Sequence, residues 1–176
     1  MKQRIKGIFS SVVVALLSSF ATAAFMPRIW ATYSPSSTMT PWASSTVTGD
    51  WSTNTTYTAQ SRRVGDTQET VLRVDLSGAP DTANLEVNPP DGVTVDEAKL
   101  LTSGNRPVVG YGMVVDNGTA NRGNVVCTWD YTANQVFIYV CTTQPNTVTQ
   151  ITQAVPQTFA TGDSVLVRFT LPVTGW

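Results

Sequence analysis

The fold is decided near the end of the chain, by residues 160–176, which read ATGDSVLVRFTLPVTGW. From residue 164 to 170 the side chains alternate between two faces, which is the two-residue period of a β-strand. One of these faces carries Val165, Val167 and Phe169. We expect the strand to be followed by a turn that lets Trp176 dock on its own domain or on a neighbouring subunit.

Strand and turn signals recur through the rest of the body. The predicted strands span residues 70–76, 84–87, 107–115, 124–131, 135–141, 147–151 and 164–171. Thr132-Ala133-Asn134 is predicted to join two of them as a hairpin, with Asn134 in a left-handed conformation. Gly110 and Gly112 indicate a bulge or a close approach of backbones. Because no amphipathic helix interrupts the series, we predict an all-β fold, an antiparallel β-sandwich or jelly roll.

The chain is predicted to have three parts. Residues 1–24 begin with three positive charges and continue as an apolar stretch, which fits a cleaved secretory signal, a retained membrane anchor or a helical arm packed in an assembly. Residues 25–58 are rich in Ser, Thr and Pro and are predicted to form an extended arm. Residues 59–176 are predicted to form the β-sandwich domain.

Composition argues against several kinds of function. The chain has no histidine and two cysteines, so the common proton shuttle and the usual zinc clusters are lacking. From Phe25 onward, eight basic residues face twelve acidic ones, which is a poor match for nucleic acid. Turn chemistry accounts for Asp91-Gly92 and Asp116-Asn117-Gly118 without a metal. We therefore predict no enzyme activity, no cofactor, no metal site and no nucleic-acid partner.

Two groups of residues are candidate structural anchors. Cys127 and Cys141 lie on the two arms of the predicted hairpin, where either a cross-strand disulfide or two thiols would fit. Trp30, Trp42 and Trp51 punctuate the polar arm, and isolated aromatics of this kind insert into a neighbouring surface or pack on their own domain. With Trp176, these tryptophans are the candidate subunit-interface residues.

Four landmarks then carry a resemblance to a known group of proteins. They are RRVGDTQE at 62–69, PPDGVTVD at 89–96 with Lys99-Leu100, VGYG at 109–112, and TGD at 161–163 with LPVTGW at 171–176. In this order, over roughly Trp42 to Trp176, they resemble the β-rich domains that end many bacteriophage tail fibres and other virion surface and decoration proteins.

The resemblance implies a function. Members of this group resemble the trimeric jelly rolls of tumour necrosis factor and complement C1q, and they serve as attachment tips, receptor-binding heads or capsid decorations. It implies a virion structural protein on the virion surface, forming a homotrimer. Its partners would be capsid, tail or membrane components and a host-surface glycan or receptor. Because the arm here is short, a decoration or spike fits better than the tip of a long fibre.

A second interpretation belongs to another class of protein. A cleaved signal peptide would make the chain an exported, secreted or periplasmic bacterial module that binds carbohydrate or acts as an adhesin. Surface Trp and Tyr residues would then serve as platforms for sugars. The fate of residues 1–24 in the mature protein discriminates between the two.

Overall fold

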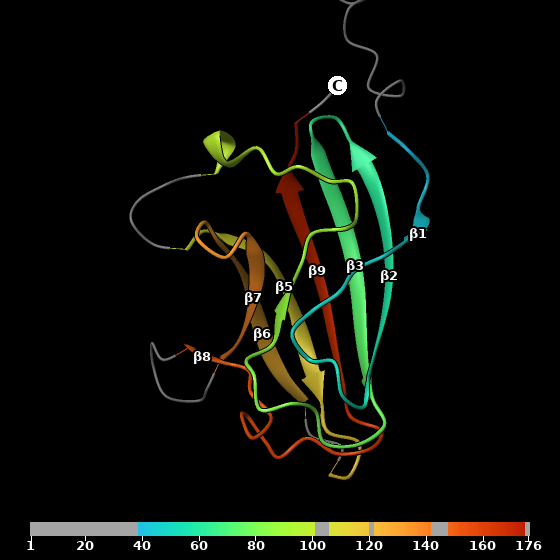
Figure 1. Ribbon diagram of the computed structural model, residues 1–176, viewed down its shortest axis with the longest axis vertical. Coiled ribbons are helices and arrows are strands. Elements are labelled where there is room, and N and C mark those ends of the chain that lie inside the picture. Colours follow the sequence, from blue (N-terminus) through green and yellow to red (C-terminus); the bar gives the residue numbers. More distant parts are fainter. Residues whose placement is uncertain (1–38, 101–105, 120–121, 142–147, 175–176) are drawn as a thin grey trace, which may run out of the picture. The chain divides into compact units, whose positions relative to one another are not determined.

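The computed structural model divides the chain into two units, Met1–Thr38 and Met39–Trp176. It describes residues 39–100, 106–119, 122–141 and 148–174 (Figure 1). Nine strands make up this part: β1 (Ala43–Ser45), β2 (Thr55–Val64), β3 (Thr67–Leu76), β4 (Glu86–Val87), β5 (Val108–Val115), β6 (Arg122–Asp130), β7 (Gln135–Cys141), β8 (Val148–Gln150) and β9 (Ser164–Pro172). The described residues contain no α-helix, and a 3-10 turn, Glu97–Lys99, follows β4.

All strands join one antiparallel sheet in the order β1-β2-β3-β9-β5-β6-β7-β4, with β8 also paired to β7. The sheet bends over on itself, so that β2, β3 and β9 lie on one side and β6 and β7 on the other (Figure 1). The chain that follows β1 brings the two ends of this order together. Gly49 pairs with Val87 of β4, and the Asp50 amide donates to the Glu86 carbonyl at 3.0 Å. The all-β prediction is confirmed and is consistent with a sandwich, while jelly-roll connectivity stays a prediction.

Alternation along the strands builds the core. On β9, Val165, Val167 and Phe169 are buried, as the two-residue period predicted. The remaining large, fully buried side chains come from β3 to β7, from β9 and from the loops: Trp51, Leu72, Val74, Leu85, Val87, Val114, Trp129, Ile138, Ile151, Phe159 and Leu171. Burial of these side chains from water is the main stabilising contribution to the domain.

The close contact between β5 and β9 explains two glycines. In the pairing of β5 with β6, the register shifts between Val108 and Gly110, which is the predicted irregularity. At Gly112 an added Cβ would lie 2.7 Å from the Val167 Cα, too near for a side chain. The hairpin prediction is also confirmed, since β6 and β7 pair directly and Asn134 has a φ of 55°.

The predicted boundary between arm and domain is wrong. All of β1 and residues 55–58 of β2 lie before residue 59. Residues 39–58 therefore belong to the sheet domain and not to an arm. The inward positions of β2 include Tyr57, Ala59 and Ser61, so the strand lacks the run of apolar β-branched residues that marks the other strands in the sequence. Ser61 is buried and exchanges hydrogen bonds with Ser45 at 2.8 Å and Thr70 at 3.0 Å. Hydrogen bonding between strands here replaces an apolar contact. Predictions for residues 1–38 lie outside the described part of the chain.

The disulfide suggested for Cys127 and Cys141 is not formed, and both are free thiols. The register pairs Cys127 with Ile138, three positions before Cys141 on β7. An odd offset puts the two side chains on opposite faces of the sheet. Cys127 accordingly lies in the core, whereas Cys141 is exposed.

Candidate functional site

The first candidate site is the solvent side of the four neighbouring strands β2, β3, β9 and β5. We call it the outer face and define it by the outward residues Gln60, Arg62, Glu69, Val71, Arg73, Tyr111, Met113, Leu166 and Arg168, together with Trp42 beside them. The strand register places Val71 opposite Arg168, and Arg168 opposite Tyr111. The residues of the outer face are therefore direct neighbours across strands.

Large apolar side chains on the outer face are left open to water. Tyr111 is 66% exposed, Val71 43%, Met113 38% and Trp42 37%. Leu166, which is half-buried, lies between Arg73 and Met113 in the register. Scattered apolar residues are common on surfaces, but a contiguous group on a regular sheet is typical of an interaction site.

A group of charges orders one side of this face. Glu69 Oε2 accepts from Arg62 Nε at 2.8 Å and from Arg168 Nη2 at 3.0 Å. The hydrogen bond from Arg62 is the main reason that the pKa of Glu69 is lowered, and the charges of both arginines add to it. Both guanidinium groups also stack over the Trp42 ring, at 4.8 Å for Arg62 and 5.8 Å for Arg168. Trp42 is therefore held in place while still exposed.

The four candidate interface tryptophans have different fates. Trp42 belongs to the outer face, where it is accessible to a partner. Trp51 is not an interface residue, because it is fully buried in its own domain. Its Nε1 donates to the Ala83 carbonyl at 2.9 Å, and its ring meets Phe159 edge-on at 5.2 Å. Trp30 and Trp176 lie outside the described residues.

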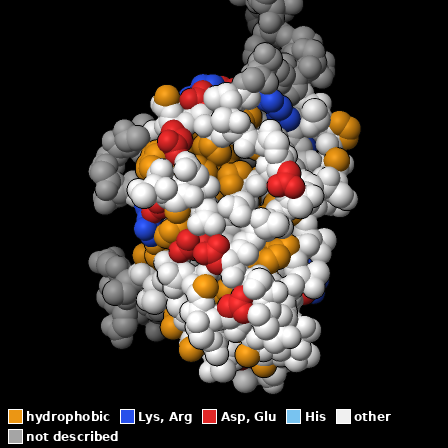
Figure 2. Space-filling view, viewed as in Figure 1, with side chains coloured by type: hydrophobic (Ala, Val, Ile, Leu, Met, Phe, Trp, Pro, Cys, Tyr) orange, Lys and Arg blue, Asp and Glu red, His pale blue; other side chains and the backbone are white. Residues whose placement is uncertain are grey.

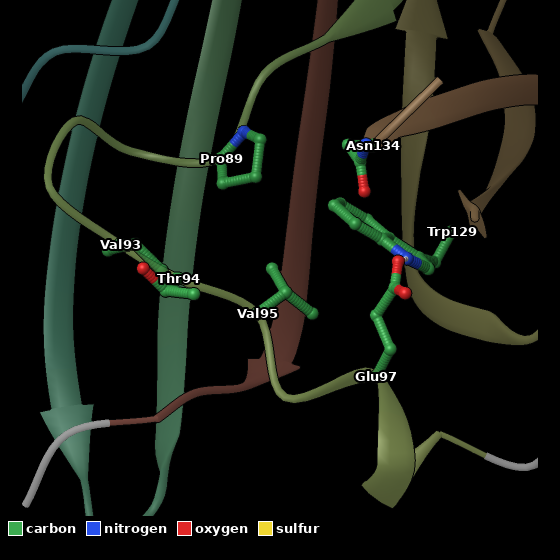
Figure 3. A pocket seen from close by; sticks show the side chains of 7 residues that line it. All are labelled: Pro89, Val93, Thr94, Val95, Glu97, Trp129 and Asn134. Carbon is green, nitrogen blue, oxygen red and sulfur yellow. Dashed lines mark hydrogen bonds between the residues drawn. The ribbon is translucent and has the colours of Figure 1, made fainter. Parts of the chain in front are cut away.

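The second candidate site is a pocket of about 430 Å³ between the segment that follows β4 and the β6–β7 hairpin. Figure 3 shows Val95 pointing into its middle, Pro89 on one wall, and Trp129 with Glu97 on the other. Val93, Thr94 and Asn134 complete the lining. Two chain reversals shape it: the turn in which the Val93 amide donates to the Pro90 carbonyl, and the hairpin turn at Asn134. No local signal in the sequence indicates this pocket, because residues 89–97 and residues 129–134 meet there from distant parts of the chain.

One hydrogen bond fixes the polar wall of the pocket. Trp129 Nε1 donates to Glu97 Oε1 at 2.9 Å, so the indole and the carboxylate hold each other in place. Trp129 is only 1% exposed, so just an edge of its ring borders the pocket. The Asn134 carboxamide reaches toward the same space from the hairpin (Figure 3).

The surface around the pocket is acidic. Figure 2 shows red carboxylate side chains across the middle of this face, with blue basic groups mainly near its margins. Hydrophobic side chains also gather in its upper half (Figure 2). The pocket lies in front of β9 on the side of the core (Figure 3), so the outer face is turned the other way.

Two acidic side chains in loops, Asp116 and Asp96, form contacts within the protein. Asp116 accepts from the Gly118 and Thr119 amides at 2.9 and 3.1 Å, which is turn chemistry. The Thr119 hydroxyl, which donates to Asp116 at 2.6 Å, is the main reason that the pKa of Asp116 is lowered, and the amide bonds add to it. Asp96 pairs with Lys99 at 3.0 Å. Across the described ranges, no group of three potential ligands converges on one point.

The part of the chain that the structure describes contains no helix long and apolar enough to cross a membrane. The predicted hydrophobic segment at residues 1–24 lies outside it. Comparison with protein-family models, with curated proteins and with solved structures finds no match to this chain.

Proposed function

We propose that this chain is a structural protein of a bacteriophage virion, whose β-domain lies on the particle surface and associates as a homotrimer. Its activity would be adhesion, either to the capsid or tail that it decorates or to a host receptor. The virion context and the number of copies rest on the resemblance carried by four sequence landmarks. The proposed self-association rests on the outer face.

The observation that carries the proposal is the exposure of Val71 on β3 and of Tyr111 and Met113 on β5, the two strands that flank β9. Covering this apolar area by a second copy would remove it from water and so favour association. Trp42 and Tyr111 add aromatic groups of the kind enriched at protein interfaces. Arg168, which pairs with Glu69, lies between Val71 and Tyr111 in the register, and arginine is also enriched at protein interfaces.

Light scattering and native mass spectrometry on the full chain and on residues 39–176 test this proposal. We expect trimers at micromolar concentration. Val71→Asp places a carboxylate within the proposed interface and should raise the dissociation constant by about a hundredfold. Val148→Asp is the matched control, because Val148 on β8 is also an exposed valine in a strand but lies away from the outer face.

A monomeric chain, or equal weakening by the two substitutions, would rule out the outer face as the association surface. Phage particles that lack the protein distinguish host attachment from decoration, by measurement of their adsorption and their mechanical strength. Lost adsorption with intact particle strength supports host attachment, whereas weakened particles with normal adsorption support decoration. Immunogold labelling of purified particles tests the surface location.

The alternative is an exported adhesive or carbohydrate-binding module, and the exposed ring of Tyr111 favours it. A flat aromatic ring on a sheet is a suitable platform for a sugar. N-terminal sequencing of the mature protein separates the proposals, since loss of residues 1–24 supports export and their retention supports an assembled particle protein. Binding of soluble glycans that disappears in Tyr111→Ala would favour this alternative.

A further inference from the structure

The pocket beside the β6–β7 hairpin contains a carboxylate without a neutralising cation. Glu97 Oε1 accepts from Trp129 Nε1, an uncharged donor. Within the described ranges, no lysine or arginine forms an ion pair with Glu97, and the nearby Lys99 is engaged by Asp66 and Asp96, each at 3.0 Å. Five of the twelve carboxylates pair with cations, namely Asp66, Glu69, Asp75, Asp96 and Asp130, and Glu97 is one of the seven for which the described residues form no ion pair. Glu97 thus has unused capacity to accept hydrogen bonds from a cationic group.

We propose that this pocket binds an arginine side chain presented by a partner polypeptide. The guanidinium group would donate to Glu97 and to the carboxamide oxygen of Asn134, and its planar set of five donors suits two such acceptors. The aliphatic stem of the arginine would lie against the apolar lining, which Pro89, Val93 and Val95 provide. The volume of about 430 Å³ lies in the range of small-ligand sites.

Charge and burial favour this occupant over a sugar. A sugar ring usually packs on the open face of an aromatic side chain, but Trp129 is 1% exposed and offers only an edge. Several carboxylates also lie on this face of the molecule (Figure 2), and their field attracts a cation and gives no advantage to a neutral ligand. A site for arginine is separate from the outer face, so this inference stands whether or not the chain forms trimers.

The indole N–H resonance of Trp129 provides a direct readout, because that group is bonded to Glu97. In 1H–15N spectra of the folded chain, Trp129→Phe identifies the resonance. We expect N-acetyl-arginine amide to shift it in a saturable way. N-acetyl-citrulline amide has nearly the same shape without the charge and should bind about tenfold more weakly or not at all.

Two variants locate the binding. Glu97→Gln keeps an acceptor for the Trp129 indole but removes the charge, and it should weaken arginine binding about tenfold. Glu86→Gln is the matched control, since Glu86 on β4 is bonded to Gln150 at 2.8 Å and does not line the pocket; its binding should equal that of the unmodified chain. If Glu97→Gln perturbs folding, Asn134→Gly serves in its place, because glycine tolerates the φ of 55° at this position.

Three results would overturn the proposal. They are a Trp129 resonance unmoved by the arginine probe at tens of millimolar, equal shifts with arginine and citrulline probes, or shifts produced by methyl glucoside and not by arginine. The last result would assign the pocket to a sugar.

Discussion

Trp51 provides the sharpest test of where the folded domain begins. Its side chain is fully buried, its Nε1 donates to the Ala83 carbonyl, and its ring meets Phe159. An aromatic side chain buries about 150–250 Å², which at about 25 cal/mol per Å² corresponds to about 4–6 kcal/mol. Alanine retains part of that area, and large-to-small changes of this kind cost about 3–5 kcal/mol. We therefore expect Trp51→Ala to lower the free energy of unfolding by about 3–5 kcal/mol.

Trp42→Ala is the matched control. Trp42 is 37% exposed and its ring is bordered by Arg62 and Arg168, so its removal should cost no more than about 1 kcal/mol. Urea unfolding of residues 39–176, followed by circular dichroism at two protein concentrations, measures both changes and separates folding from association. Trp51→Phe keeps a ring next to Phe159 and should cost less than Trp51→Ala. Our reasoning fails if Trp51→Ala lies within about 1 kcal/mol of the unmodified chain, or if Trp42→Ala costs as much.

Three further predictions concern packing, thiol chemistry and acid stability. Gly112→Ala should cost about 1–3 kcal/mol in urea unfolding, because the added methyl group would run into the β9 backbone near the Leu166 carbonyl; an unchanged midpoint would contradict the close approach. Iodoacetamide, with mass spectrometry, should modify Cys141 in the folded protein and Cys127 only after unfolding, since burial raises the pKa of the Cys127 thiol to about 12. Hydrogen bonds from Thr53 and Ser52 lower the pKa of Asp81 to about 2, so its ionised form stabilises the fold above the ordinary pKa of 3.8 and this contribution disappears as the pH falls through 2. Asp81→Asn should therefore be less stable than the unmodified chain at neutral pH and similar to it near pH 2, and a difference that does not depend on pH would refute this.

Local signals in the sequence were sufficient for much of the sheet. The β6–β7 hairpin was predictable because Asn134 favours a left-handed turn and both arms are rich in β-branched and aromatic residues. The alternation on β9 correctly separated its buried face from its exposed one. Each of these features depends on residues within a few positions of one another.

Features set by distant contacts could not be predicted. The position of Trp51 depends on Ala83 and Phe159, which are remote in sequence, so the residue looked like part of a polar arm. The disulfide depended on the register between β6 and β7, and an odd offset was enough to place Cys127 and Cys141 on opposite faces. The pocket forms where Glu97 is bonded to Trp129, and the alternation of side chains along the strands does not predict this contact.

Residues 39–50 join the two ends of the sheet, and this affects how readily strands of other molecules can add to it. Thr40 and β1 occupy backbone groups along β2, and Thr48 to Asp50 occupy those along β4. A foreign strand could pair with β2 or β4 there only by displacing this segment, and beyond β2 the sheet ends in the three-residue strand β1. So short an edge limits the ladder growth that leads to fibrils. Removing residues 1–50 should therefore expose the backbone hydrogen-bonding groups of β2 and of β4 at the same time and promote aggregation.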